Sequence, residues 1–192
     1  MSFLLNKTEL LNSDWENEME GNKQGFAFVM NTDPSNAKEA ITWIYQASVA
    51  GNVRAQYQLA LCWHQGRGLH QNLQEAARWY LRAAEGGYVR AMYNTSLCYS
   101  SGQVRVQAHR LARKWMKKAA ERGHSKAQFE HGLGLFSEGE MMKAVVYLEL
   151  ATRAGETAAA RVKNVIVQQL SATSHDRAMH LADNWRALPS TR

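Results

Sequence analysis

The residues of this chain whose types could support chemistry do not fall at the spacings that such chemistry needs. The seven histidines form no His-x-x-x-His pair, no Cys-x-x-Cys motif is present, and no histidine has a carboxylate at metal-ligand spacing. His175 and His180 are five residues apart, which places them on different faces of a helix. We therefore expect no metal site and no cofactor. The histidines are His64, His70, His109, His124, His131, His175 and His180.

Signatures of catalysis are missing from the sequence in the same way. It contains no Gly-x-Ser-x-Gly motif and no glycine-rich phosphate loop. The pair Gly132-x-Gly134 lies within a helical pattern, where glycine favours close helix packing over a phosphate cradle. We expect no catalytic residue, no enzyme activity and no small-molecule substrate.

Basic residues, in contrast, recur in register along the chain. They form two basic ladders with a 36-residue step: Arg78 and Arg82 with Lys114 and Lys118, and Arg54 with Arg90 and Lys126. One interpretation is a solvated face partly neutralised by Glu85 and Glu121. The other is a basic surface that binds an acidic protein segment or RNA. Few aromatic residues lie among these charges, which argues against stacking on single-stranded nucleic acid.

The 36-residue step is the period of an internal repeat. The segment Ala76–Gly87 recurs as Ala112–Gly123, and more weakly as Ala40–Gly51 and Ala144–Gly155. Each copy has a small residue, an aromatic residue three positions on, a second small residue at position seven and a closing glycine. The first three share one helical stripe, and the glycine favours a left-handed helix end. The aromatic residues, which we predict to be repeat core, are Trp43, Trp79, Trp115 and Tyr147.

This pattern predicts helices over 37–50, 73–86, 109–122 and 141–154, which we call B helices. A helices are predicted between them, over 53–65, 89–101 and 125–137, and an A-like run continues from 159 to 170. Their apolar stripes are Ala55, Tyr57, Leu59 and Leu61, then Ala91, Tyr93 and Leu97, then Ala127, Phe129 and Leu133.

Helix ends are also indicated by the sequence. Asp33-Pro34 is a helix start, and Asn72 with Glu75 is typical of a capping box. Thr173 with Asp176 predicts a cap for a last helix over about 175–186.

Charge divides the chain into an acidic arm and a basic body. Residues 1–36 hold two lysines and six carboxylates, a net charge of −4, which leaves +10 for the rest of a chain whose total is +6. No segment has the 18–20 consecutive apolar residues of a membrane span, and the first residues are too short for a signal-peptide core. We expect no membrane association and a cytoplasmic or nuclear location.

The two cysteines, Cys62 and Cys98, occupy the same slot of adjacent repeats. Equivalent Cα atoms of stacked repeats lie about 10 Å apart, beyond the roughly 7 Å limit for a disulfide. We predict two buried free thiols.

The repeat resembles the Sel-one-like repeat, a longer relative of the tetratricopeptide repeat. The residues that carry the resemblance are the Ala-x-x-Trp-Tyr-x-x-Ala-Ala-Glu-x-Gly core, the Gly66-x-Gly68 turn before it and Ala-x-Tyr-x-Leu after it. The resemblance implies an all-α, right-handed solenoid of antiparallel helix pairs, with units at about 37–54, 55–90, 91–126, 127–158 and a C-terminal cap at 159–186. We divide the chain into an acidic, partly flexible segment, 1–33, and this solenoid, 34–192.

The resemblance also implies an adaptor in a macromolecular complex. The segment from Ala127 to Trp185 is most similar to the arrays that follow an F-box in plant ubiquitin-ligase subunits. Residues 1–36 are too few and too acidic to form an F-box, so the chain would be a fragment, a paralogue that lost the F-box, or an unrelated user of the array.

The concave face of such a superhelix is lined by A helices, and we expect it to bind the partner. Two columns are predicted to face solvent there: Gln58, Asn94 and Glu130, and Gln56, Met92 and Gln128. We expect a non-catalytic scaffold whose partner is a protein with an acidic or extended segment. The alternative is a nucleic-acid-binding solenoid that uses the basic ladders.

Overall fold

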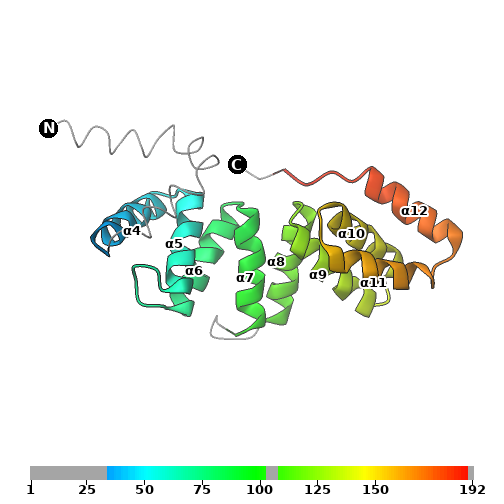
Figure 1. Cartoon of the computed structure of the whole chain (residues 1–192), viewed down its shortest axis with the longest axis horizontal. Helices are drawn as coiled ribbons and strands as arrows, with labels where there is room; N and C mark the ends of the chain where they lie inside the picture. Colours follow the sequence, from blue (N-terminus) through cyan, green and yellow to red (C-terminus); the bar gives the residue numbers. More distant parts are fainter. Residues whose placement is uncertain (1–33, 103–107, 190–192) are drawn as a thin grey trace. The chain divides into compact units, whose positions relative to one another are not determined.

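The computed structural model describes residues 34–102 and 108–189, and within these ranges every regular element is an α-helix (Figure 1). The helices are α4 (Pro34–Val49), α5 (Val53–Gln65), α6 (Leu73–Glu85), α7 (Val89–Ser100), α8 (His109–Glu121), α9 (Ser125–Ser137), α10 (Met141–Arg153), α11 (Thr157–Val167) and α12 (Ala172–Asp183).

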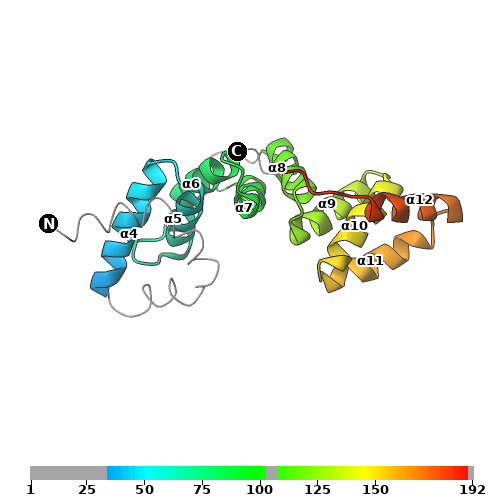
Figure 2. The ribbon, with the colours of Figure 1, turned by 90° about the horizontal axis from the view of Figure 1, so that it is seen from above.

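These helices confirm the predicted alternation of A and B helices. The A helices are α5, α7, α9 and α11, and the B helices are α4, α6, α8 and α10. The described residues form two compact units, which divide between Trp79 and Tyr80. In the second unit α7 packs on α8, α8 on α9, α9 on α10 and α10 on α11, so successive helices are neighbours (Figures 1 and 2).

Each B helix ends as the closing glycine predicts. At the end of α8, Gly123 has a φ of +86°, its N–H donates to the Ala120 carbonyl at 3.0 Å, and the His124 N–H donates to the Ala119 carbonyl at 3.0 Å. This pair of bonds is a Schellman motif, and the same pair closes α4, α6 and α10. The turn fixes the direction in which the next A helix begins.

Two predicted helix starts differ in detail. The Asn72 side-chain oxygen accepts hydrogen bonds from the N–H groups of Gln74 and Glu75, as a cap does. The capping box is incomplete, because Glu75 pairs with Arg78 and the Asn72 N–H donates to the Trp63 carbonyl. The last helix begins at Ala172 with Ser171 as its cap, whereas the sequence predicted Thr173 as the cap and a start at about residue 175.

The small and aromatic columns of the B helices form the predicted core with one exception. Trp79 and Trp115 are buried, and Tyr147 is half-buried, as are Tyr57, Tyr93 and Phe129 on the A helices. Trp43 is 43% exposed, so its assignment to the core was wrong. It lies on α4, and no helix of the described residues precedes α4 to cover that side.

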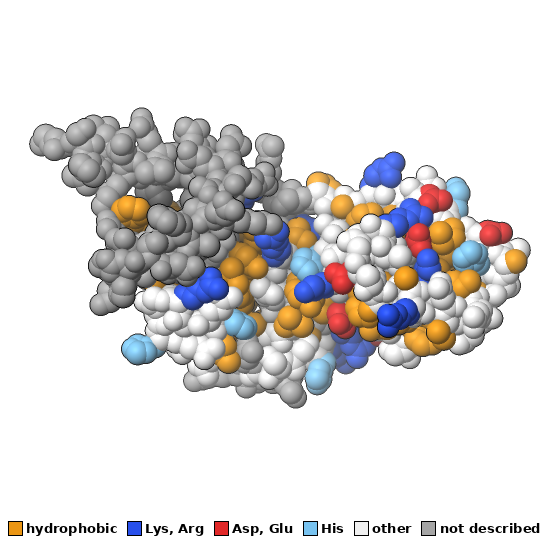
Figure 3. Space-filling model, viewed as in Figure 1, with side chains coloured by type: hydrophobic (Ala, Val, Ile, Leu, Met, Phe, Trp, Pro, Cys, Tyr) orange, Lys and Arg blue, Asp and Glu red, His pale blue; other side chains and the backbone are white. Residues whose placement is uncertain are grey.

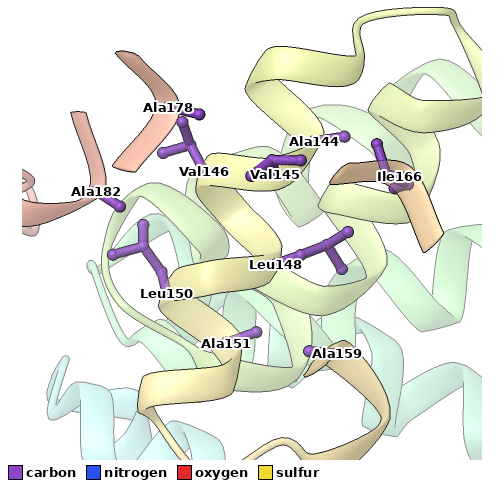
Figure 4. Close-up of a cluster of buried hydrophobic side chains, with 10 residues drawn as sticks. All are labelled: Ala144, Val145, Val146, Leu148, Leu150, Ala151, Ala159, Ile166, Ala178 and Ala182. Atoms are coloured by element: carbon purple, nitrogen blue, oxygen red, sulfur yellow. The ribbon is translucent and has the colours of Figure 1, made fainter. Parts of the chain in front are cut away.

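The core of the second unit is centred on α10 (Figure 4). That helix contributes Ala144, Val145, Val146, Leu148, Leu150 and Ala151, and α11 and α12 close over it with Ala159, Ile166, Ala178 and Ala182. Helix α12 packs on α10, and the chain then returns to α8, where the Leu188 N–H donates to the Glu121 carbonyl at 2.9 Å. The C-terminal segment therefore runs back from α12 to the turn that ends α8.

Candidate protein-interaction surface

Each A helix of the second unit has one partly exposed stripe. The second residue of each of these helices shares a face with the residues four and seven positions later. These residues are Arg90, Asn94 and Leu97 on α7, Lys126, Glu130 and Leu133 on α9, and Ala158, Val162 and Val165 on α11. We call this set the A-helix face. It is the candidate binding surface.

Two large apolar side chains of the A-helix face are open to solvent. Leu97 is 42% exposed and Val165 is 56% exposed, and Leu133 between them is half-buried. Leu97 was predicted in the buried stripe of its helix, and that prediction was wrong, because position +7 turns away from the neighbouring B helix. In Figure 3, hydrophobic side chains reach the surface between charged ones over the helices of the second unit.

The N-terminal ends of the three A helices are linked by side chains. The His124 ring stacks on Tyr93 with 4.5 Å between ring centroids, and Ser125 donates to a Glu156 carboxylate oxygen at 2.8 Å. His124 also caps α9, because its Nδ1 accepts a hydrogen bond from the Ala127 N–H at 3.2 Å. These contacts join α7 to α9 and α9 to α11 and hold the three stripes side by side.

The charges around this junction favour the neutral form of His124. Its pKa is lowered, first by burial and then by the positive charges of Arg90 and Lys126, against an opposing effect of Glu156. Burial, followed by Glu130 and Glu156, raises the pKa of the Tyr93 hydroxyl. Arg90 and Lys126 are both exposed, and neither forms an ion pair with any residue that the structure describes.

One of the two predicted partner-binding columns does not face solvent. Met92 and Gln128 are each only 2% exposed, and Gln56 is half-buried. The amides of Gln56 and Gln128 donate to carbonyls at the end of the preceding B helix, Ser48 at 3.1 Å and Ala120 at 3.3 Å. Gln56 and Gln128 thus tie their A helices to the B helix before. The assignment of Met92 and Gln128 to the binding surface was wrong, because both are buried, whereas that of Gln56 stays a prediction.

The other predicted column has mixed exposure. Glu130 is exposed, whereas Gln58 and Asn94 are half-buried. Their role in binding stays a prediction.

The basic ladders lie mostly at the surface. Arg78, Arg82, Lys114 and Lys118 are exposed on B helices, Arg90 and Lys126 are exposed on A helices, and Arg54 is half-buried. Arg78 pairs with Glu75, and the Lys118 ammonium lies 4.5 Å from the centroid of the Trp115 ring. Glu121, which one interpretation gave as partly neutralising the ladder, pairs at 3.7 Å with Lys117, which is not a ladder residue.

Other candidate groups are accounted for by packing. Cys62 and Cys98 are free and buried, and burial raises the pKa of each thiol to about 11. In the part of the chain that the structure describes, no cluster of three His, Cys, Asp or Glu residues is placed to hold a metal ion. Nor does any helix of that part have the length and apolar character to cross a membrane. The acidic residues Glu9 to Glu20 lie outside the described residues.

Comparison with known proteins agrees with this architecture. A model of the Sel1 repeat matches residues 53–88, 89–124 and 125–156. The crystal structure of a Sel1 repeat protein from Oxalobacter formigenes is similar with a TM-score of 0.59 and 30% identity, over 65% of this chain and 51% of that one. The protective antigen c5321 of uropathogenic Escherichia coli, which displays an SLR fold, is similar in fold with a TM-score of 0.54 and 20% identity, over 81% of this chain and 41% of that one.

The fold and its neighbours define an all-α repeat solenoid. The matched repeats cover more than half of the chain, and the chain belongs to the Sel1 repeat family. In sequence it is similar to F-box protein At1g70590 of Arabidopsis thaliana, with 70% identity over 172 residues, 88% of this chain and 49% of that protein. The chain thus spans about half the length of that plant relative. Sel1 repeats are generally protein-interaction modules, and repeat solenoids bind through extended surfaces.

Proposed function

We propose that this chain is a non-catalytic scaffold that binds a protein partner through the A-helix face. The observation that carries the proposal is the exposure of Leu97 and Val165 on helices whose other apolar residues are largely covered. Large apolar side chains in register at a surface are typical of interaction sites, whereas single ones are ordinary. The partner-binding function also agrees with the membership of the Sel1 family.

The complex in which the scaffold works is the finer part of the proposal. A relative with 70% identity is named an F-box protein, which supports a place for this chain in a ubiquitin-ligase complex or in another multiprotein assembly. We place that assembly in the cytoplasm or nucleus. A fluorescent fusion expressed in the native organism tests the location directly.

Affinity capture from the native organism, read by mass spectrometry, tests the binding function. The bait is the full chain, and the comparison bait carries Leu97→Ser and Val165→Ser. We expect proteins that are captured reproducibly, that capture the chain in the reciprocal experiment, and that are lost with the double variant. Recovery of ubiquitin-ligase subunits supports the specific form of the proposal. Recovery of no reciprocal protein partner, or of RNA-associated proteins alone, overturns it.

A further inference from the structure

The A-helix face combines two rows of side chains with different chemistry. The apolar row is Leu97, Leu133 and Val165, and the basic row is Arg90 and Lys126. Seven residues separate the two rows on α7 and on α9, which corresponds to about 10 Å along each helix axis. A partner that uses both rows must therefore cover a surface about 10 Å wide.

That width distinguishes the secondary structure of the partner. An extended segment occupies only about 5 Å across its strand direction and can follow one row. An α-helix is about 10–12 Å in diameter with its side chains, so it can contact both rows at once. The three A helices follow one another along the unit and are joined at their N-terminal ends by the Tyr93–His124 and Ser125–Glu156 contacts, so a partner helix that crosses them meets one apolar anchor on each.

Charge then fixes the chemistry of the partner. Arg90 and Lys126 lie in the first turns of α7 and α9, close enough to lower the pKa of His124, and no described residue forms an ion pair with either. Cations at the N-terminal end of a helix oppose its dipole, so this arrangement does not stabilise the fold. Glu130 lies between the two rows and would repel an acidic group placed over the middle of the face.

We infer that the A-helix face binds an amphipathic α-helix of a protein partner, with its apolar stripe on Leu97, Leu133 and Val165 and its acidic residues confined to the flank that faces Arg90 and Lys126. This inference rests on the proposed function and names the partner's chemistry. It replaces the extended peptide expected from the sequence, since such a peptide would engage one row only. Recognition of this kind is the helix-in-groove mode.

A synthetic peptide of about 18 residues tests the inference with the full chain. It carries leucines at helical spacing, glutamates along one flank, alanines elsewhere and a terminal fluorophore for anisotropy measurements. One comparison peptide has lysine in place of each glutamate, and another is scrambled to remove the helical periodicity. We expect the chain to bind the glutamate peptide at least tenfold more tightly than either of the others.

Two double variants locate the contact. Leu97→Ser with Val165→Ser, and Arg90→Glu with Lys126→Glu, should each weaken binding of the glutamate peptide at least tenfold. The charge-reversed variant should now prefer the lysine peptide, which a merely unfolded variant could not do. The matched control is Leu111→Ser with Arg110→Glu on α8, both exposed in the structure and outside the basic ladders, and it should bind like the original chain. Circular dichroism checks that all variants remain helical.

Several results overturn the inference. They are absence of binding to the glutamate peptide, equal binding of the scrambled peptide, and equal loss in the α8 control. Tighter binding of a single-stranded oligouridine, abolished by Arg90→Glu with Lys126→Glu, would assign the basic row to nucleic acid instead. Failure here is separable from failure of the proposed function. If natural partners are captured by the original chain and lost with Leu97→Ser and Val165→Ser, but the glutamate peptide does not bind, the proposed function stands and the inference of an acidic helical partner is wrong.

Discussion

At the scale of single residues, His124 both caps α9 and lies beside the A-helix face, so its protonation state affects the stability of that part of the fold. Its Nδ1 must be unprotonated to accept the hydrogen bond from Ala127, and burial together with Arg90 and Lys126 keeps it so. Asn52 fills the same place before α5 and caps that helix with a side-chain oxygen. The two repeats therefore satisfy the same orphan N–H group with different chemistry, and only His124 makes the cap sensitive to pH.

Acidification should destabilise the chain through this cap. The pKa of His124 is lower in the folded state than in the unfolded state, so below about pH 6.5 the unfolded chain binds the extra proton and stability falls, by up to about 1.4 kcal/mol per pH unit. His124→Asn keeps a capping side chain and should make the decline shallower between pH 7 and 5. Urea unfolding across this range measures the difference. His131, whose pKa is lowered by burial and by Lys117, should account for part of the remaining slope.

The control for this experiment is His109→Asn, which removes an exposed imidazole. It should leave the decline close to that of the original chain. An identical decline in His124→Asn and in the original chain would contradict the role given to the cap.

Two glycines of α9 allow a second comparison at the residue scale. A Cβ on Gly132 would lie 3.0 Å from Leu148 Cγ and 3.2 Å from its Cδ2, and Leu148 is fully buried among other side chains, so making room requires the core to shift. Gly132→Ala should therefore destabilise the chain by about 1–2 kcal/mol, even though alanine favours helix. A Cβ on Gly134 meets no atom within 4 Å, so Gly134→Ala should stabilise by up to about 1 kcal/mol. Thermal or urea unfolding decides, and a Gly132→Ala chain as stable as the original would refute the close-packing role of Gly132.

At the scale of elements, α10 organises the second unit. Its apolar side chains contact α9, α11 and α12, and its Glu149 carboxylate adds hydrogen bonds between these helices. Glu149 accepts hydrogen bonds from Lys163 of α11 at 2.6 Å and from Arg153 at 2.7 Å, and Arg153 also donates to Asp183 of α12 at 2.7 Å. One nearly buried carboxylate thus links three helices.

Removing this charge should loosen the C-terminal helices. Glu149→Gln leaves Lys163 without its partner near the core and should destabilise by on the order of 2 kcal/mol. Glu140→Gln breaks only the exposed pair with Lys143 and should cost less than about 1 kcal/mol. Urea unfolding measures both, and equal effects would show that the Glu149 network adds nothing beyond a surface pair.

Protonation of Glu149 should also lower the stability of the fold in acid. Burial alone would raise the pKa of Glu149, but the hydrogen bonds and charges of Lys163 and Arg153 outweigh burial and lower it. Its contribution to stability is therefore present above the pKa of the unfolded state and is lost as the pH falls through the lower pKa of the folded state. Glu149→Gln should flatten the acid-unfolding curve below about pH 4.5.

At the scale of the whole molecule, the sign of the charge changes along the chain. Residues 1–33 carry a net charge of −4 and the remaining residues +10. The acidic arm therefore lowers the attraction of the whole chain for an acidic partner, whether or not it touches the basic ladders. This effect acts through the electrostatic field of all the charges of the chain together, so it should depend strongly on salt concentration.

Deleting residues 1–33 should accelerate association with the glutamate peptide by several-fold at low ionic strength, and the gain should shrink near 0.3 M salt. Stopped-flow anisotropy measures the association rate. A full-length chain in which the acidic residues from Glu9 to Glu20 are replaced by their amides should behave like the deletion. If only the deletion has an effect, the arm acts by occupying space, and if neither has one, the charge argument fails.

The sequence by itself determined the helices, their alternation and the turns between them. Periodic alanine, aromatic and glycine positions specify these features locally, because helix stripes and left-handed helix ends depend on residues close in the chain. The tertiary structure decided which side chains remain open. Met92 and Leu97 lie on one helix and are both apolar, yet only Leu97 is exposed, because a neighbouring B helix covers one side of α7 and not the other. Burial depends on contacts between distant segments, and a local pattern does not contain them.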